Sequence, residues 1–168
     1  VLNIDIGGGT TKLAVCRQGQ VTEVCAINLG ARLMALDADG RVVRLEDAGR
    51  DIGRRLGLDL ALGATVQDAD LARMADWMAD RIVAFAQMGR WDGDTPDLLR
   101  TPMLTYAGAT QAVVFSGGVS EFLHGREPSA FGDLGHHLGT ALRARLDGLP
   151  AAVVAHRGSI RATVVGAS

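Results

Sequence analysis

Aromatic residues are scarce in this sequence, at 4% of 168 positions, so the core must be built from Leu, Val, Ile and Ala. Cysteine occurs only at positions 16 and 25, which excludes a disulfide framework, and two reduced thiols are typical of a cytoplasmic protein. Basic residues are not in excess: the net charge is −2, so the chain lacks the charge pattern of a nucleic-acid-binding protein. The longest uncharged stretch, residues 101–120, contains Pro102 and several polar residues, so no membrane span is expected, and no signal peptide is visible.

The rest of the composition is that of one ordinary globular domain. Apolar residues make up 48% and charged residues 21% of the chain, and a chain of this length can bury a substantial core. Apolar residues nevertheless reach both ends, in residues 1–6 and 162–168, where natural termini are usually polar. We therefore expect the sequence to be a piece of a longer protein.

The order of predicted strands and helices indicates an α/β domain. Apolar stripes at helical spacing predict one long helix, from an N-cap at Asp68 to a stop at Gly89. Further helices are expected over residues 46–56 and 131–146, and strands over residues 2–6, 12–17, 20–26, 32–36, 41–45, 111–115, 151–155 and 161–165.

The first predicted hairpin determines where the two cysteines lie. A turn near Gln18-Gly19 that pairs Cys16 with Val21 would place Cys25 opposite Lys12. The thiols would then be four positions apart along the ladder, about 13 Å, which is too far for a disulfide.

A glycine-rich segment between the first strand and the hairpin carries the strongest functional signal. It reads Asp5-Ile6-Gly7-Gly8-Gly9-Thr10-Thr11-Lys12. Three glycines allow a tight turn that brings backbone amides close to an oxyanion, and the two threonine hydroxyls add donors for phosphate oxygens. Asp5 ends the strand, where a carboxylate can hold a hydrated Mg²⁺, and Lys12 either adds charge or is merely exposed. A glycine-rich turn without a ligand is the alternative, but the Asp before the glycines and the Thr pair after them favour phosphate binding.

A second glycine pair follows the strand predicted over residues 111–115, in Ser116-Gly117-Gly118-Val119. Such a turn lets a flat base or a ribose lie against bare backbone, although alone it is an ordinary strand-to-helix turn. Together the two glycine motifs are more specific than either one. A branched side chain at Gly8 or Gly117 is expected to abolish nucleotide binding, and to leave the fold intact unless the glycine needs a positive φ.

The two motifs resemble the second phosphate loop and the adenosine loop of the actin-like ATPase superfamily, which includes sugar kinases, actin and heat-shock chaperone ATPases. The resemblance implies a ribonuclease H-like fold, a mixed sheet with helices, of which this chain would be one half. Residues 1–45 and 107–168 would form the nucleotide-binding subdomain, and residues 46–106 a smaller inserted subdomain. The first phosphate loop of the superfamily is absent, so a complete cleft is not expected in this chain.

This resemblance also implies ATP and Mg²⁺ as cofactors, with Asp5 as the catalytic and metal-binding residue. The residues expected to bind the nucleotide are Gly7, Gly8, Gly9, Thr10, Thr11, Lys12, Ser116, Gly117, Gly118 and Val119.

Nearly the whole chain resembles the ethanolamine ammonia-lyase reactivating factors, the EutA family. The segments that carry the resemblance are residues 4–15, 115–122, 131–135 and 160–167. It implies a chaperone-like, ATP-dependent protein that frees ethanolamine ammonia-lyase of damaged cobalamin, in the cytoplasm and in association with a bacterial microcompartment. The full-length protein would be a weak ATPase and this chain alone inactive. A small-molecule kinase and an actin-like structural protein are the alternatives within the superfamily.

Several further residues are weaker candidates. The resemblance to chaperone ATPases suggests that Arg50, Arg54 or Glu46 contacts adenine, although a solvated helix face is the favoured interpretation. Asp133 is expected either to cap a helix or to help order the nucleotide cleft. The four histidines, at positions 124, 136, 137 and 156, show no metal-binding spacing.

Overall fold

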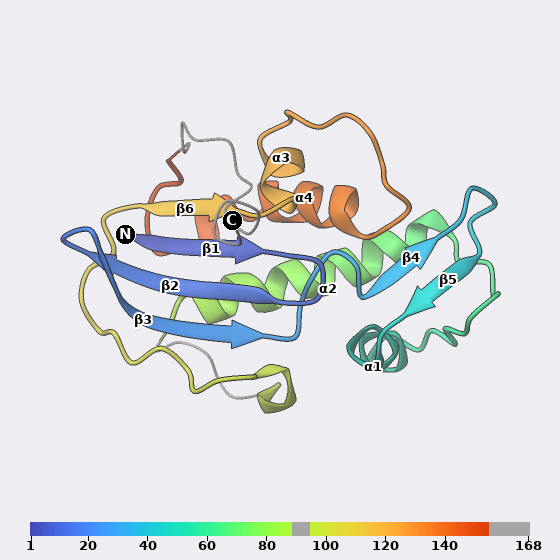
Figure 1. The fold of residues 1–168 in the computed structure, drawn as a ribbon, viewed down its shortest axis with the longest axis horizontal. Coiled ribbons are helices and arrows are strands. Elements are labelled where there is room, and N and C mark those ends of the chain that lie inside the picture. The colour runs from blue at the N-terminus through green and yellow to red at the C-terminus, as the bar shows by residue number, and fades with distance from the viewer. Residues whose placement is uncertain (89–94, 155–168) are drawn as a thin grey trace, which may run out of the picture.

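The computed structural model describes residues 1–88 and 95–154, which fold around a four-stranded sheet (Figure 1). The strand order is β3 (Gln20–Ile27), β2 (Thr11–Arg17), β1 (Leu2–Ile6) and β6 (Val113–Ser116). β1, β2 and β3 form an antiparallel meander, and β6 lies parallel to β1. This mixed sheet with its helices confirms the predicted α/β class.

The β2–β3 pairing differs from the prediction by one residue. Cys16 pairs with Val21 as expected, but a register shift next to Cys16 places Cys25 opposite Leu13 instead of Lys12. One extra residue on a strand, a β-bulge, causes such a shift. Both thiols are free, and burial raises the pKa of the Cys25 thiol.

The second predicted hairpin and the helix after it form the other end of the molecule (Figure 1). β4 (Met34–Leu36) pairs with β5 (Val42–Leu45), and α1 (Asp47–Arg55) follows directly. The Asp37 carboxylate accepts hydrogen bonds from two backbone amides of the turn, and Gly40 takes a φ of +75°. These are the residues that such a turn requires, so the hairpin is predictable from its sequence.

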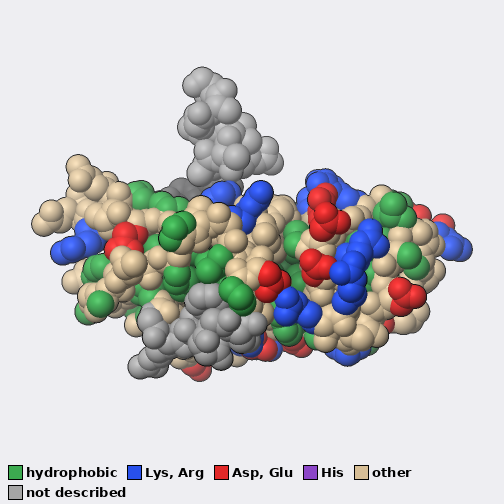
Figure 2. All heavy atoms as spheres, turned by 90° about the horizontal axis from the view of Figure 1, so that it is seen from below, with side chains coloured by type: hydrophobic (Ala, Val, Ile, Leu, Met, Phe, Trp, Pro, Cys, Tyr) green, Lys and Arg blue, Asp and Glu red, His purple; other side chains and the backbone are tan. Residues whose placement is uncertain are grey.

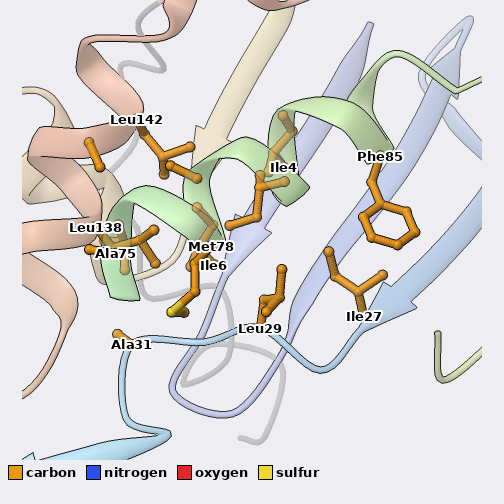
Figure 3. Close-up of a cluster of buried hydrophobic side chains, with 14 of the residues drawn as sticks. Ile4, Ile6, Ile27, Leu29, Ala31, Ala75, Met78, Phe85, Leu138 and Leu142 are labelled. Atoms are coloured by element: carbon orange, nitrogen blue, oxygen red, sulfur yellow. The ribbon is translucent and has the colours of Figure 1, made fainter. Parts of the chain in front are cut away.

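Helix α2 (Asp68–Ala86) packs against the buried face of the sheet (Figure 3). Its Met78 and Phe85 lie in one hydrophobic cluster with Ile4 and Ile27 of the strands. The predicted stripe is buried throughout, in Leu71, Met74, Ala75, Met78, Ile82 and Phe85. Burying a side chain of this size stabilises the fold by about 1.5–3 kcal/mol, so α2 contributes much of the core.

The ends of α2 differ slightly from the prediction. Gln67 is the N-cap and Asp68 the first helical residue, where its charge favours the positive end of the helix dipole. Gly89, the predicted stop, lies outside the described residues, and the helix has already ended at Ala86. Later in the chain, residues Pro96–Leu98 form a 3₁₀ turn, η1.

After β6 the chain forms α3 (Val119–Leu123), α4 (Gly135–Arg143) and a 3₁₀ turn, η2 (Leu146–Gly148). The predicted helix over residues 131–146 is therefore shorter at both ends. Gly132 takes a left-handed φ of +66°, which a right-handed helix does not allow, and Asp133 forms an isolated β-bridge with Ala35 of β4, so the helix begins only after these residues.

The last predicted strands are only partly covered by the described residues. Among the described residues 151–154, Val153 forms a bridge to Val113 of β6. Residues 155 onward lie outside the described part, as does the strand predicted over residues 161–165. Within residues 1–88 and 95–154, no helix combines the length and apolarity needed to cross a bilayer.

The predicted division into two subdomains stays a prediction. β4, β5 and α1 lie apart from the main sheet in Figure 1, whereas α2, which falls within residues 46–106, packs against that sheet.

Candidate nucleotide site

The two glycine motifs lie side by side, at the carboxyl ends of neighbouring strands. β1 and β6 are parallel, and their register pairs Asp5 with Ser116. The loop of residues 7–10 leaves β1 where the Gly117-Gly118 turn leaves β6 (Figure 1). In open α/β sheets, the crevice outside the carboxyl ends of the strands is where ligands bind. The structure therefore brings together the two motifs that the sequence singles out.

The glycine loop, residues 7–10, is held by backbone hydrogen bonds that leave some of its amides free. The Gly7 amide donates to the Thr10 carbonyl at 3.0 Å, and the carbonyls of Gly7 and Gly8 accept from residues 31 and 32 at 3.0 and 2.6 Å. Gly8 and Gly9 are exposed, and their amides donate to no acceptor within the described residues. Exposed amides that point from one loop are what an oxyanion such as phosphate needs.

A third glycine, Gly30, is required by the packing of this loop. A side chain at Gly30 would collide with the Gly8 carbonyl oxygen and would come within 2.6 Å of the carbonyl carbon of Gly9. Only glycine lets two backbones approach so closely. The sequence did not suggest this role, although a glycine three residues after a strand is compatible with such a close approach.

The predicted threonine donors are not equivalent. Thr11 is fully buried, and its hydroxyl donates to the Leu29 carbonyl at 2.7 Å, so it fixes the loop instead of facing solvent. Thr10 is half-buried at the end of the glycine loop. The Lys12 side chain is 52% exposed, and its Nζ lies 3.9 Å from the Asp5 carboxylate.

Asp5 is partly exposed, and the strands around it fix its position. Its Oδ1 accepts a hydrogen bond from Ser116 Oγ at 3.1 Å, and Asn3 Nδ2 donates to the same Ser116 hydroxyl at 3.2 Å. Asn3 is a residue that the sequence did not suggest. Its position on the same strand face as Asp5, two residues away, is the signal that could have found it.

The Asp5 carboxylate of this site is compatible with a Mg²⁺ ion that keeps most of its waters, and not with an ion bound by protein ligands alone. Within the part of the chain that the structure describes, no cluster of three or more His, Cys, Asp or Glu residues could hold a metal ion. Mg²⁺ usually keeps several waters and is held by one or two carboxylates together with substrate phosphates. Asp5, with 27% of its side chain exposed beside the glycine loop, fits that role.

Gly117 is held in a conformation that other residues rarely adopt. Its φ is +81°, and a side chain there would collide with the Ile6 carbonyl oxygen and lie 2.9 Å from Asp5 Oδ1. The Ser120 hydroxyl donates to the Gly117 carbonyl at 2.7 Å and so stabilises the turn. Gly117 is therefore one of the positions where a branched side chain would disturb the fold itself. At Gly8, by contrast, a side chain would meet Arg32 at an ordinary contact distance, with 3.5 Å between the two Cβ atoms.

A hollow of about 160 Å³ lies between the two motifs. The residues that line it are Ile6, Gly7, Gly8, Ala31, Arg32, Gly118, Val119, Phe122, Phe131, Asp133 and Gly135. Phe131 is 61% exposed, and its ring packs edge-on against Phe122 at 5.9 Å between centroids. Asp133 both lines this hollow and caps α4, since its Oδ1 accepts from the Gly135 amide at 2.8 Å. Both roles considered for Asp133 are thus compatible with its position.

The charged residues of α1 do not line this hollow. Arg54 pairs with Asp51 on the same helix, and Glu46 pairs with Arg44 of β5. Figure 2 shows side chains of both charge signs together at this end of the molecule. Such mixed, paired charges are typical of a solvated surface, so a contact between α1 and adenine has no support in the arrangement of these side chains.

Comparison with known proteins gives a family match over the whole chain. Residues 1–168 match the family described as ethanolamine utilisation protein EutA. The chain is 35% identical to the ethanolamine ammonia-lyase reactivase EutA of Salmonella typhimurium and 33% identical to that of Escherichia coli. Each alignment covers 99% of this chain and 36% of the relative, so the chain spans about a third of the length of these curated relatives.

A solved structure is similar at a lower level. It is component A of the (R)-2-hydroxyglutaryl-CoA dehydratase of Acidaminococcus fermentans, at 16% identity and a TM-score of 0.38, over 91% of this chain and 54% of that one. A similarity of this size does not by itself establish a shared fold.

Proposed function

Because this chain belongs to the EutA family, we propose that it forms one side of the nucleotide cleft in a chaperone-like reactivating factor for ethanolamine ammonia-lyase. The full-length protein would bind ATP with Mg²⁺ and promote the release of damaged cobalamin from the lyase. The observation that carries this proposal is the contact between the two glycine motifs at the carboxyl ends of β1 and β6. The free amides of one motif and the bare backbone of the other suit phosphate and nucleoside respectively.

Each predicted residue then has a separate task. The Gly8 and Gly9 amides would bind phosphate oxygens, while the Gly7 carbonyl and the Thr11 hydroxyl keep the loop in shape. Asp5 would hold a hydrated Mg²⁺ through its exposed oxygen, and Lys12 would add positive charge close by.

The second motif has its own tasks. Ser116 would fix the Asp5 carboxylate by its hydrogen bond. Gly117 and Gly118 would leave space for the nucleoside, and the buried Val119 would support that turn. The Thr10 hydroxyl, at the edge of the glycine loop, remains a proposed hydrogen-bond donor to a phosphate oxygen.

The other side of the cleft would come from the part of the protein that this chain does not contain. The chain spans 36% of its curated relatives, and in cleft-type ATPases the phosphates are bound from both sides. ATP would supply free energy for a change of angle between the two halves, and that change would alter the contact with the lyase. With one side missing, water would weaken each remaining electrostatic contact, so this chain alone should bind ATP weakly and hydrolyse it negligibly.

The names of the two reactivase relatives do not favour either alternative, a small-molecule kinase or an actin-like structural protein. We further propose a cytoplasmic location, associated with a microcompartment, in keeping with two free thiols. Fractionation of cells that express the full-length protein tests this location, and recovery in an oxidising compartment would contradict it.

The test uses the full-length protein and ethanolamine ammonia-lyase that carries damaged cobalamin. We expect recovery of lyase activity that depends on ATP and Mg²⁺ and is lost in Gly8→Val, whose side chain would occupy the phosphate-facing surface of the loop. Val43→Thr is the control, because Val43 is 59% exposed on β5, away from both motifs. Recovery without ATP, or equal recovery by Gly8→Val and the wild-type protein, would contradict the proposal.

A further inference from the structure

Arg32 lies directly over the glycine loop. Its backbone amide donates to the Gly8 carbonyl at 2.6 Å, so the residue is fixed to the loop at its base. A Cβ placed on Gly8 would lie 3.5, 3.6 and 3.7 Å from Cβ, Cγ and Cδ of Arg32. The aliphatic stem of Arg32 therefore runs along the face of Gly8, toward the hollow that both residues line.

The guanidinium of Arg32 has a weak partner in Asp133, which lines the same hollow. Its Nε lies 3.9 Å from Oδ2 of Asp133, which is longer than a hydrogen bond. The Arg32 side chain is 59% exposed, whereas that of Asp133 is 10% exposed. Since the other carboxylate oxygen of Asp133 already caps α4, Asp133 is fixed and Arg32 is the partner that can move.

We propose that Arg32 is a phosphate-binding arm that exchanges Asp133 for the phosphates of a nucleoside polyphosphate. This inference rests on the proposed nucleotide site and adds a residue that none of the sequence motifs contains. An arginine forms two parallel hydrogen bonds with a phosphate, which are stronger than a long ion pair to a carboxylate. Gly8 lies next to the Arg32 stem, and its amide donates to no acceptor within the described residues, so one phosphate group can use both the guanidinium and the loop amides.

Asp133 makes this exchange selective for charge. A carboxylate in the wall of the hollow repels anions and binds Arg32 when no polyphosphate is present. A ligand must therefore offer more negative charge to Arg32 than Asp133 does. ATP and ADP meet this condition, whereas adenosine, which has no phosphate, does not.

The experiment measures the affinities of the full-length protein for ATP, ADP and adenosine by competition with a fluorescent nucleotide. We expect Arg32→Met to lose tenfold or more in affinity for ATP and ADP and less than twofold for adenosine. Arg32→Lys should recover part of that loss, because it keeps the charge without the planar pair of donors. Arg17→Met is the matched control. Arg17 is an exposed arginine at the end of β2 that is far from the glycine loop, so its loss should change none of the three affinities.

Asp133→Asn tests the exchange itself and keeps an acceptor for the cap of α4. It should raise ATP affinity threefold to tenfold, and this gain should shrink in the double variant with Arg32→Met, since coupled residues are not additive. Equal losses for ATP and adenosine, or an unchanged ATP affinity in Arg32→Met, would overturn the inference. If Gly8→Val still abolished ATP binding in that case, the proposed site would stand. Absence of ATP binding by the wild-type protein would overturn both.

Discussion

Replacement of Gly117 by alanine should destabilise the chain far more than the same replacement of Gly8. Both glycines belong to the proposed nucleotide site, but their backbones differ. Gly117 has a φ of +81°, and the Ile6 carbonyl occupies the space that a Cβ on Gly117 would need. The nearest atom to a Cβ on Gly8, by contrast, is Arg32 Cβ at an ordinary 3.5 Å. The contrast separates a glycine that the fold needs from one that a ligand would need.

The magnitude follows from two costs at Gly117. A left-handed conformation costs a residue with a side chain about 1–2 kcal/mol, and a forced contact in a packed region costs about 1–3 kcal/mol. The contact is severe here, because the new Cβ would lie 2.8 Å from the Ile6 carbonyl carbon at the end of β1. We therefore expect a loss of about 3 kcal/mol in the free energy of unfolding for Gly117→Ala, and a change of about 0.5 kcal/mol or less for Gly8→Ala.

Urea unfolding of the 168-residue chain, followed by circular dichroism, measures both variants. The slope of the free energy against urea should be unchanged, so that the shift in midpoint reports stability alone. In thermal unfolding, about 3 kcal/mol corresponds to a fall in Tm of about 6–12 °C for a chain of this size. Equal midpoints for the two variants would refute the argument from backbone conformation.

Three further predictions concern single groups. Asp5→Ala in the full-length protein should weaken ATP binding more with Mg²⁺ than without it, measured by calorimetry; equal losses would make Asp5 structural. Cys25, whose thiol pKa is raised by burial, should react with a thiol reagent at pH 8 much more slowly than the half-buried Cys16 until the chain unfolds, and equal rates would contradict its burial. The hydrogen bond from Arg126 lowers the pKa of Glu121, so this pair stabilises the fold above the unfolded-state pKa of Glu and ceases to do so as the pH falls through the folded-state pKa. Glu121→Gln should therefore weaken the fall in the free energy of unfolding at acid pH. An unchanged dependence on pH would show that the pair does not contribute to stability.

Local patterns predicted the main elements well, because neighbouring residues determine them. Leu2, Ile4 and Ile6 alternate on β1, and α2 shows its buried stripe in the sequence. The same alternation could have shown that Thr11 shares the buried face of β2 with Leu13, so that its hydroxyl could not face a ligand.

Features that depend on distant contacts could not be read in this way. No glycine or proline marks the bulge beside Cys16, so the register of Cys25 was wrong by one residue. The late start of α4 depends on the bridge between Asp133 and Ala35, from different ends of the sequence. Arg32 and Asp133 likewise meet only in the folded chain, and no local motif contains both.

The segment of residues 30–36 connects the glycine loop to β4. At one end its amides are bound to the carbonyls of Gly7 and Gly8, and at the other the Leu36 amide donates to the Gly132 carbonyl at 2.6 Å. Residue 36 lies four residues after residue 32, at most about 13 Å along the chain, so a displacement of the glycine loop would be carried into β4, and from there to β5 and α1. Binding of phosphate at the glycine loop would then shift the surface formed by β4, β5 and α1, which does not contact the phosphate. Hydrogen exchange at the Leu36 amide, measured with and without nucleotide, would record that movement. Identical exchange rates would show that residues 30–36 do not carry a displacement of the glycine loop to β4.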